Sequence, residues 1–388
     1  MNDELLLTFT NLYGKRKGIA TYFAPARLNL IGDHIDYNGG HVLPCSITLG
    51  TYATIRLRKD KRLNFYSMNN SQDGVIHASL DNLTSIRDGG WVDYLLGVIW
   101  SYTQRGIDIP CGMDMAIWGN VPQAVGLASS ASLGALMAYI LNDAFGFLLS
   151  GQDMAMICQY AENNFKGIDC GSMDHFAVFM GKKDQAIYLD TATLKYEYVP
   201  IEFRDLKIIV TDTMTKHEMA EIIAAKRRME CSRALESIQT RISCDALGDL
   251  SIDEFEEYRD SIVDDKIFHR GKHAVYENQR TIKAKKALAE GNIEKFGMLM
   301  NESHASLRDD YETSCMECDI LVEAAWSVDG VIGSRITGAG CGGCIVSLVR
   351  ADALETFVKT LTAVYEDKVH MTPAFFVVET CDGPCRIL

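Results

Sequence analysis

The sequence predicts an α+β protein of two lobes. Three observations carry this prediction: a strand-rich first half with two loop-to-helix transitions, a strongly helical second half, and a strand-helix-strand ending. A chain of 388 residues is long enough for two domains with a core each. We predict domains over 1–205 and 206–388. Because no proline- or serine-rich linker separates them, we expect the two to share a large interface.

The first half is expected to consist of strands and two buried helices. Residues 51–57 and 62–66 have the alternation of a hairpin around a charged turn at 58–61. The stretch 115–142 carries no charged residue and is long enough to span a membrane, but Asn120, Pro122 and several glycines and serines favour a strand, a loop and a buried helix. The expected elements are strand 113–118, helix 129–145, helix 152–164, strand 186–190 and strand 194–200.

The second half begins with an apolar strand and becomes helical. Apolar residues recur at helical spacing between charged faces, which predicts helices packed on one side. The expected elements are strand 206–210, helix 272–288, helix 293–301, strand 344–349, helix 352–365 and strand 375–378.

Composition excludes some classes of function. The formal net charge of -14 argues against a large nucleic-acid footprint, and the acidic start of the chain is unlike a signal peptide. The 12 cysteines are expected to be free thiols of a cytoplasmic protein. Two CxxC pairs have the spacing of a zinc ribbon, but Cys341/Cys344 lie in a glycine-rich loop, and Cys315/Cys318 are expected at the start of a helix.

Three motifs carry polar or glycine-rich chemistry. The first, Arg27 to Gly40, holds an arginine, a histidine and two aspartates, which suit a ligand with several hydroxyls, although a solvated turn is the simpler alternative. The second, Val121 to Ser132, is a small-residue loop opening an apolar helix. It suits an anion such as a phosphate, with a serine N-cap on a buried helix as the alternative. The third, Thr337 to Cys344, has four glycines in six residues and suits close backbone approach or a tight turn.

Together and in this order, the motifs resemble the GHMP kinases, and within them the galactokinases. The galactokinase signature is close to GRxNLIGEHxDYNxGxVLP, and the chain has ARLNLIGDHIDYNGGHVLP ending at Pro44. The resemblance extends over nearly the whole chain, including segments at 161–163, 170–174, 272–278 and 307–311. It implies an N-terminal domain like domain 2 of ribosomal protein S5 and a ferredoxin-like C-terminal domain, with the site in the cleft between them.

The resemblance also implies roles for individual residues. Asp174 would be the catalytic carboxylate, as a base or as an electrostatic positioner, with Arg27 as its partner. Magnesium would be held by Glu162 and by Ser129 or Ser130. Sugar contacts are implied for Asp33, His34, Asp36 and Gly171, with Ala224 also at the sugar. Nucleotide contacts are implied for Trp91, Gly126, Leu127, Ser129, Ser130, Ala131, Ser132, Gly338 and Gly340, with a core tryptophan as the alternative for Trp91. The third loop is expected to hold close either to the nucleotide or to the phosphate loop.

Several of these positions depart from the galactokinase pattern. Asp33 stands where Glu is usual, and Ala224 where a tyrosine touches the sugar. The phosphate loop has Ala124, Val125 and Ala128 in place of the usual Gly, a small residue and Ser. Cys341 replaces a phenylalanine. His175 replaces a glutamine next to Asp174.

These features predict an ATP- and Mg²⁺-dependent kinase that phosphorylates the anomeric hydroxyl of galactose in the Leloir route. One alternative is a kinase for a modified galactose such as N-acetylgalactosamine, motivated by Asp33 and Ala224. Another is a sugar and nucleotide sensor without turnover, motivated by the altered phosphate loop and opposed by the retained Asp174. The expected partners are the sugar and ATP, with no nucleic acid and no membrane. We expect a monomer, although the sequence does not give the oligomeric state.

Overall fold

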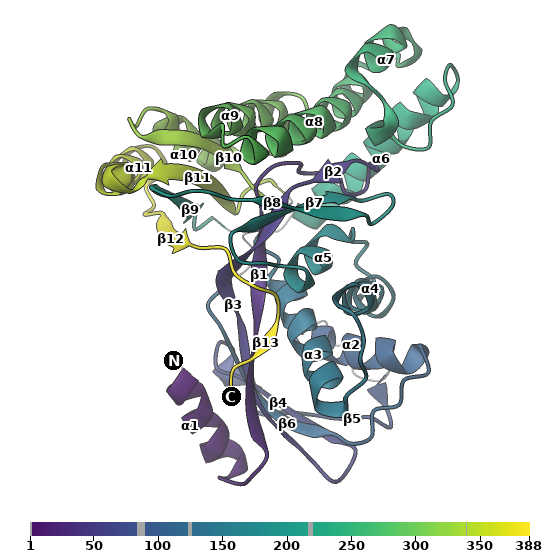
Figure 1. Ribbon diagram of the computed structural model, residues 1–388, viewed down its shortest axis with the longest axis vertical. Coiled ribbons are helices and arrows are strands. Elements are labelled where there is room, and N and C mark those ends of the chain that lie inside the picture. Colours follow the sequence, from purple (N-terminus) through teal and green to yellow (C-terminus); the bar gives the residue numbers. More distant parts are fainter. Residues whose placement is uncertain (1, 84–89, 123–125, 216–219, 339) are drawn as a thin grey trace.

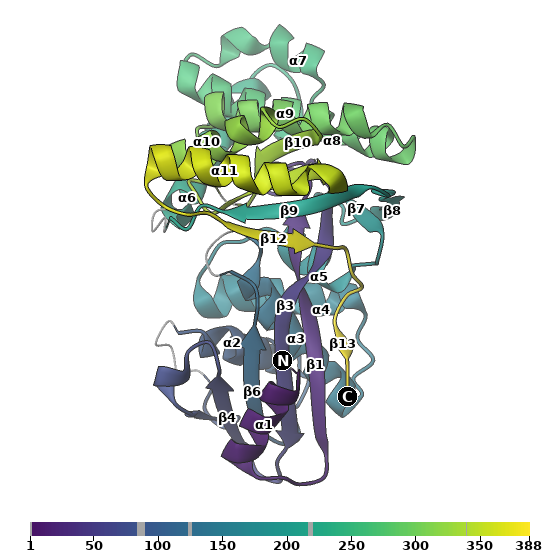
Figure 2. The same ribbon diagram turned by 90° about the vertical axis from the view of Figure 1, so that its left-hand side faces the viewer.

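The computed structural model describes residues 2–83, 90–122, 126–215, 220–338 and 340–388. The molecule is elongated and has two lobes, with the long strands β1 and β3 running along its longest axis (Figures 1 and 2). Both chain termini lie in the lower lobe of Figure 1.

The lower lobe is built on a six-stranded sheet with the order β13-β1-β3-β6-β4-β5. Helices α2, α3 and α4 pack on one face around the main apolar core of this lobe, and α1 covers β6 through Leu5 and Phe9 (Figure 1). The elements are α1 Asn2–Tyr13, β1 Ile19–Asn29, β3 Pro44–Leu57, β4 Arg62–Ser67, η1 Ser71–Asp73, β5 Ile76–Ser79, α2 Val92–Gln104, β6 Met113–Gly119, α3 Ser129–Phe145, α4 Gly151–Ala161, a π-helix Glu162–Lys166, α5 Met173–Phe179 and β13 Cys385–Arg386.

The predicted hairpin over 51–57 and 62–66 is wrong in its pairing, although both strands exist. β6 lies between β3 and β4, antiparallel to the first and parallel to the second. The turn passes over the start of β6, where Arg58 and Asp60 exchange backbone hydrogen bonds with Gly112. A Cβ on Gly112 would come within 1.8 Å of the Arg62 carbonyl oxygen, so glycine allows this crossing.

The upper lobe is built on a four-stranded antiparallel sheet with the order β10-β11-β9-β12, against which α9, α10 and α11 pack (Figure 2). Helices α6 and α7 extend outward beside α8 (Figure 1). The elements are β9 Leu206–Asp212, α6 Ala220–Gln239, η4 Leu247–Asp249, α7 Ile252–Glu257, η5 Arg259–Ser261, α8 Asp265–Ala289, α9 Ile293–Asp309, α10 Met316–Trp326, β10 Val331–Ile336, β11 Cys344–Arg350, η6 Ala351–Ala353, α11 Leu354–Val369 and β12 Ala374–Val378.

A three-stranded antiparallel sheet connects the lobes, with β7 between β2 and β8. Its strands are β2 His41–Val42, β7 Gln185–Asp190 and β8 Tyr196–Pro200. The chain then crosses into the upper lobe at β9, which begins at Leu206, and returns at its end so that β13 pairs with β1. The domain boundary near residue 205 stays a prediction. Because the C-terminal strand β13 returns to pair with β1, the chain passes between the lobes a second time at its C-terminal end.

Most predicted elements are present. The helix expected over 129–145 has those bounds; Ala135, Leu136 and Ile140 bury its apolar side, and Gly146 ends it in the left-handed region at φ 67°. The helix expected over 152–164 begins one residue earlier, where Ser150 and Asp153 form a capping box, and changes to a π-helix at Glu162. No helix among the described residues is long and apolar enough to cross a membrane.

The cysteine predictions are also confirmed in part. All twelve cysteines are free thiols, and Cys315 is the N-cap of α10. Among the described residues, the two CxxC pairs belong to no group of three or more His, Cys, Asp or Glu side chains close enough to hold a metal ion.

Candidate active site

A cleft of about 450 Å³ lies between the lobes, and separate parts of the chain line it. The loop after β1 contributes Asp33, His34 and Asp36, and the segment entering α5 contributes Gly171 and Asp174. The remaining lining residues that concern the site are Arg27, Tyr37, Asp169, Cys170, Ala224, Arg228 and Gly338. Every residue predicted to catalyse or to touch sugar therefore lies on this cleft.

Arg27 and Asp174 form an ion pair at its base. Arg27 Nε and Nη2 each lie 2.8 Å from Asp174 Oδ1, and Arg27 Nη1 donates to the Gly126 carbonyl oxygen at 2.5 Å. Arg27 is buried on β1, whereas about a third of the Asp174 side chain is exposed to the cleft. The guanidinium thus connects the candidate catalytic carboxylate to the predicted phosphate loop.

Asp36 reaches the cleft beside Gly171. A Cβ on Gly171 would come within 2.0 Å of Asp36 Oδ2, so the carboxylate can sit against this backbone only because the residue is glycine. Burial and then the nearby Asp174 charge raise the pKa of Asp36 to about 6, although Arg228 and Arg27 act in the opposite direction. Two carboxylates are therefore held close together at one end of the cleft.

His34 presents an unpaired ring nitrogen in this cleft. Its backbone is left-handed, at φ 63°, and its Nδ1 lies 2.8 Å from the Tyr37 hydroxyl, which lies 2.8 Å from the Tyr311 hydroxyl. Burial, together with His273, Arg227 and Arg228, lowers the pKa of His34 to about 3, so the ring is neutral at physiological pH. Its buried Nε2 has no hydrogen-bond partner in the described part of the chain, which leaves it open to a ligand hydroxyl.

Both carboxylate oxygens of Asp33 contact other side chains of the protein. Its Oδ1 accepts a hydrogen bond from Asn29 Nδ2 at 2.8 Å, and its Oδ2 is paired with the fully buried Arg335 of β10. Arg335 also donates to the carbonyl oxygens of Asn29 and Leu30 at 3.0 and 3.2 Å. The shorter carboxylate at this position is thus drawn toward Arg335 while still lining the cleft.

Ala224 lines the cleft from α6. On the next turn, Arg228 pairs with Asp169 (Nη1 to Oδ2, 2.6 Å) and lies over the Tyr37 ring at 4.9 Å. The sequence indicated no role for Arg228, Asp169 or Tyr37. The position of Tyr37 directly after Asp36 was the one available signal, because Arg228 and Asp169 meet only in the fold.

The phosphate loop and the third glycine loop pack against each other. A Cβ on Gly338 would come within 2.6 Å of Gly126 Cα, so the third loop lies on the phosphate loop at this point. Gly340 packs instead on Thr313, whose carbonyl oxygen would lie 2.4 Å from an added Cβ. The departures at Ala124 and Val125 lie outside the described residues. Ala128 adopts the left-handed conformation, at φ 57°, as the N-cap of α3.

Three other predicted nucleotide residues face the core. Leu127 and Ala131 are buried, and the Ser132 hydroxyl donates to the Ala24 carbonyl oxygen at 2.9 Å and lies 2.9 Å from the Thr51 hydroxyl. The side chains of these residues are thus committed to the protein, and only their backbone amides are suited to a phosphate.

Ser129 and Ser130 face a second hollow, of about 550 Å³. Trp91 and Tyr94 of the α2 region line it as well, as does Val121 from the start of the second motif. An aromatic wall beside the first turn of a helix suits a base stacked near its phosphates. The structure thus brings the predicted Trp91 and both serines to one place.

Glu162 lies buried behind this hollow, at the start of the π-helix. Burial raises the pKa of Glu162, but His175 and the Ser130 hydroxyl lower it more, so the carboxyl titrates below its usual range. Its Oε1 is buried and has no hydrogen-bond partner among the described residues. A free carboxylate oxygen next to a serine hydroxyl fits the oxygen ligands that Mg²⁺ prefers.

Comparison with known proteins gives the family. Residues 7–57 match the galactokinase galactose-binding signature, 93–182 the GHMP kinases N terminal domain, and 284–367 the GHMP kinases C terminal domain. A galactokinase of Clostridium beijerinckii is 46% identical over 379 residues, which cover 98% of this chain and 97% of the relative. The chain belongs to the galactokinases of the GHMP kinase family. A Bacillus subtilis galactokinase is 41% identical over 99% of this chain and 98% of its own length.

Solved structures agree with this family and with its α+β fold of N- and C-terminal domains. The Lactococcus lactis galactokinase complexed with galactose has a TM-score of 0.97 at 41% identity, and the two chains cover each other completely. The mevalonate kinase of Methanococcus jannaschii has a TM-score of 0.67 at 17% identity over 95% of this chain and 100% of its own, and shares the fold. As a galactokinase-family member, the chain is a sugar kinase that uses ATP.

Proposed function

We propose that this protein transfers the γ-phosphoryl group of ATP to the anomeric hydroxyl of D-galactose and forms galactose 1-phosphate and ADP. One observation carries the proposal: the Arg27–Asp174 pair joins a cleft with two carboxylates and a neutral imidazole to the glycine loop at Gly126. We also propose a cytoplasmic monomer, in keeping with the free thiols and the use of ATP.

The sugar is held by its hydroxyls. Asp36 accepts hydrogen bonds from a sugar hydroxyl, and His34 Nε2, which has no partner among the described residues, exchanges one with another hydroxyl. Gly171 lets the Asp36 carboxylate approach closely enough to do so. Asp33 binds the sugar through the lone pairs of its carboxylate oxygens that Arg335 and Asn29 do not use.

Asp174 then accepts the proton of the anomeric hydroxyl as the new bond to phosphorus forms. Arg27 stays paired with it and places a positive charge between the carboxylate and the carbonyl oxygen of Gly126, on the side of the transferred group. Phosphoryl transfer needs positioning and charge stabilisation above all, and a buried arginine fixed at both ends supplies both.

Glu162, with Ser129 or Ser130, would hold the Mg²⁺ that accompanies ATP. Bound there, the ion would neutralise charge on the phosphates. Trp91 and Tyr94 would stack on the adenine.

A coupled ADP-release assay with Mg·ATP tests the proposal against galactose, N-acetylgalactosamine, galactosamine, glucose and arabinose. Rapid turnover on galactose alone supports it. No turnover on any of these sugars, with galactose binding still detected by calorimetry, contradicts it and favours the sensor alternative.

A kinase for a 2-acylamino galactose is the second candidate, and the small side chain of Ala224 in the wall of the cleft favours it. Ala224→Tyr would fill that wall, so the ratio of kcat/KM for galactose to that for N-acetylgalactosamine should rise by on the order of tenfold or more. Met229→Tyr adds the same ring on an exposed position of α6 and should leave the ratio unchanged. An unchanged ratio in Ala224→Tyr would remove this residue from the specificity argument.

A further inference from the structure

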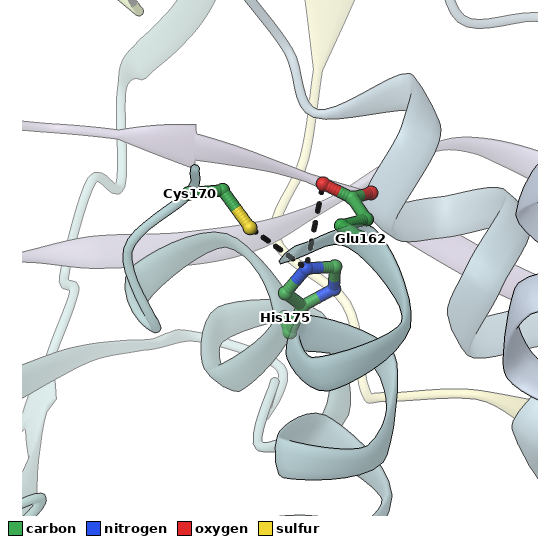
Figure 3. A group of neighbouring side chains, drawn as sticks. All are labelled: Glu162, Cys170 and His175. Atoms are coloured by element: carbon green, nitrogen blue, oxygen red, sulfur yellow. Dashed lines mark hydrogen bonds and ion pairs between the residues drawn. The ribbon is translucent and has the colours of Figure 1, made fainter. Parts of the chain in front are cut away.

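Three side chains with metal-binding atoms converge behind the cleft (Figure 3). Glu162 comes from the π-helix, Cys170 from the loop that follows it, and His175 from α5. His175 Nε2 lies 3.7 Å from Glu162 Oε2 and 3.8 Å from Cys170 Sγ, and the three ligand atoms all lie within 4.8 Å of one another. The proposed reaction gives no role to Cys170 or His175.

The contacts within this group are long. The 3.7 Å between His175 Nε2 and Glu162 Oε2 exceeds the length of an ordinary hydrogen bond, and the hydrogen bond between Cys170 Sγ and His175 Nε2 is 3.8 Å long. Glu162 Oε1 and His175 Nδ1 are buried and have no hydrogen-bond partner among the described residues. The Cys170 thiol donates to Asn163 Oδ1 at 3.1 Å. The atoms that approach one another are instead Glu162 Oε2, Cys170 Sγ and His175 Nε2, and their convergence carries the case for a bound ion.

Two of the three spacings are close to those around a tetrahedral ion. Zinc bonds to sulfur, nitrogen and oxygen place neighbouring ligand atoms about 3.4–3.6 Å apart at the tetrahedral angle. The observed 3.7 and 3.8 Å need a shift of a few tenths of an ångström to match. Cys170 also lines the cleft, which gives an ion a route from solvent.

We propose that Glu162, Cys170 and His175 form a binding site for a borderline divalent cation, Zn²⁺ above all, with a fourth position open to water or to a phosphate oxygen. Thiolate and imidazole ligands favour Zn²⁺ over Mg²⁺, which prefers oxygen ligands alone. Cys170 binds as the thiolate, and its proton passes to solvent. His175 decides the chemistry of the site, because a glutamine at this position would offer only an amide.

The site places two ions in competition for one carboxylate. This step rests on the proposed function, in which Glu162 also holds the magnesium of Mg·ATP. Zn²⁺ bound to Glu162, Cys170 and His175 occupies that carboxylate, so it should inhibit phosphoryl transfer, and excess Mg²⁺ should relieve the inhibition.

Cobalt replaces zinc as a coloured probe in the first experiment. The full chain, reduced and free of metal, ATP and sugar, is titrated with Co²⁺. We expect one equivalent to bind with a thiolate-to-cobalt charge-transfer band and visible bands of tetrahedral intensity, both lost on adding Zn²⁺. Absence of the charge-transfer band in the wild type overturns the proposal.

Three variants identify the ligands. Cys170→Ser should lose the charge-transfer band, and His175→Gln should weaken Co²⁺ binding by tenfold or more. Cys385→Ser removes an exposed thiol elsewhere and should behave as the wild type. Circular dichroism confirms folding, and His175→Gln decides the matter if Cys170→Ser does not fold. Unchanged binding in a folded His175→Gln overturns the assignment.

A kinase assay then tests the competition. In the wild type, the Zn²⁺ concentration that halves the rate should rise with Mg²⁺, and in His175→Gln it should be at least tenfold higher. Zinc inhibition that is insensitive to His175→Gln contradicts the competition. The cobalt titration contains neither ATP nor sugar. Its result therefore tests the metal site independently of the proposed galactokinase reaction.

Discussion

At the scale of single residues, the site depends on how neighbouring charges are arranged. Arg27 is buried and fixed by Asp174 on one side and by the Gly126 carbonyl oxygen on the other. Asp174 alone of this pair is substantially exposed to the cleft. A ligand hydroxyl in the cleft can therefore contact the Asp174 carboxylate directly, whereas the Arg27 guanidinium is shielded from it.

Asp174→Asn tests this arrangement. Asparagine keeps the shape of the side chain but neither accepts a proton nor carries charge, so kcat should fall by on the order of 10²- to 10⁴-fold. Galactose binding, measured by calorimetry, should persist. Asp352→Asn, at an exposed position of the upper lobe, is the control. A kcat close to that of the wild type in Asp174→Asn would remove Asp174 from its catalytic role.

The carboxyl of Asp36 makes stability depend on pH. Its pKa is raised from 3.8 to about 6 in the fold, so the folded protein binds the proton more tightly than the unfolded chain. This contribution to stability is complete below pH 4 and is lost as pH rises through 6. The loss is at most about 3 kcal/mol for a shift of this size.

Asp36→Asn should remove this particular loss. The difference in the free energy of unfolding between variant and wild type, measured with urea from pH 4 to pH 7, should shift in favour of the variant as pH rises. Asp352→Asn should show no such trend. A difference that stays constant over this range would show that Asp36 is not perturbed by its surroundings.

The sequence identified these residues because they lie within short motifs. Asp33, His34 and Asp36 fall within four positions, and Asp174 stands beside Gly171. It could not indicate that Asp33 is paired with Arg335, about three hundred positions away, or that Arg228 meets Asp169, because such contacts depend on how the lobes close.

At the scale of elements, local pattern predicted several of the helices but not the pairing of the strands. The apolar run from Ala131 to Leu141 is enough to define α3, and Gly146 to end it. The predicted hairpin between β3 and β4 is wrong because β6 lies between these strands and pairs with both. β6 comes some fifty residues later in the chain, so the local sequence could not indicate this pairing. The Gly112 that admits the crossing has no local signature.

The N-cap of α3 carries a second test. Ala128 is left-handed, which costs an ordinary residue about 1–2 kcal/mol. Ala128→Gly removes this strain but adds unfolded-state entropy, so the net stability should rise by about 0.5–1 kcal/mol. Ala135→Gly, in the helical interior of the same element, should instead lose about 1 kcal/mol. Urea denaturation measures both, and a loss in Ala128→Gly would mean that the cap is not strained.

At the scale of the whole molecule, contacts between the lobes hold the sugar loop and the glycine loops in one arrangement. Arg335 of β10 donates to the Asn29 and Leu30 carbonyl oxygens, and the Thr337 hydroxyl donates to Asn29 as well, at 3.2 Å. Directly after Thr337, Gly338 lies on Gly126. The lower lobe thus supplies the predicted phosphate loop and the Arg27–Asp174 pair, and the upper lobe packs against that loop at Gly338.

Gly338→Ala should loosen this junction. The added Cβ would come within 2.6 Å of Gly126 Cα, and φ at this position is +88°, so the two loops must separate. Displacing the phosphate loop should raise the KM for ATP by on the order of tenfold or more, since small misplacements at such sites are costly. Sugar affinity should change less, because Asp36 and His34 come from the loop after β1 and not from either glycine loop.

Gly106→Ala separates this effect from backbone strain alone. Gly106 has φ +75° and nothing within 4 Å of an added Cβ, so the substitution introduces comparable strain without a clash. It lies just after the C-terminal end of α2, and it does not line the cleft. Both variants should lose stability in thermal denaturation, but only Gly338→Ala should raise the KM for ATP. An equal KM in the two variants would mean that contact between the lobes does not position the phosphate loop, and that α3 alone holds it in place.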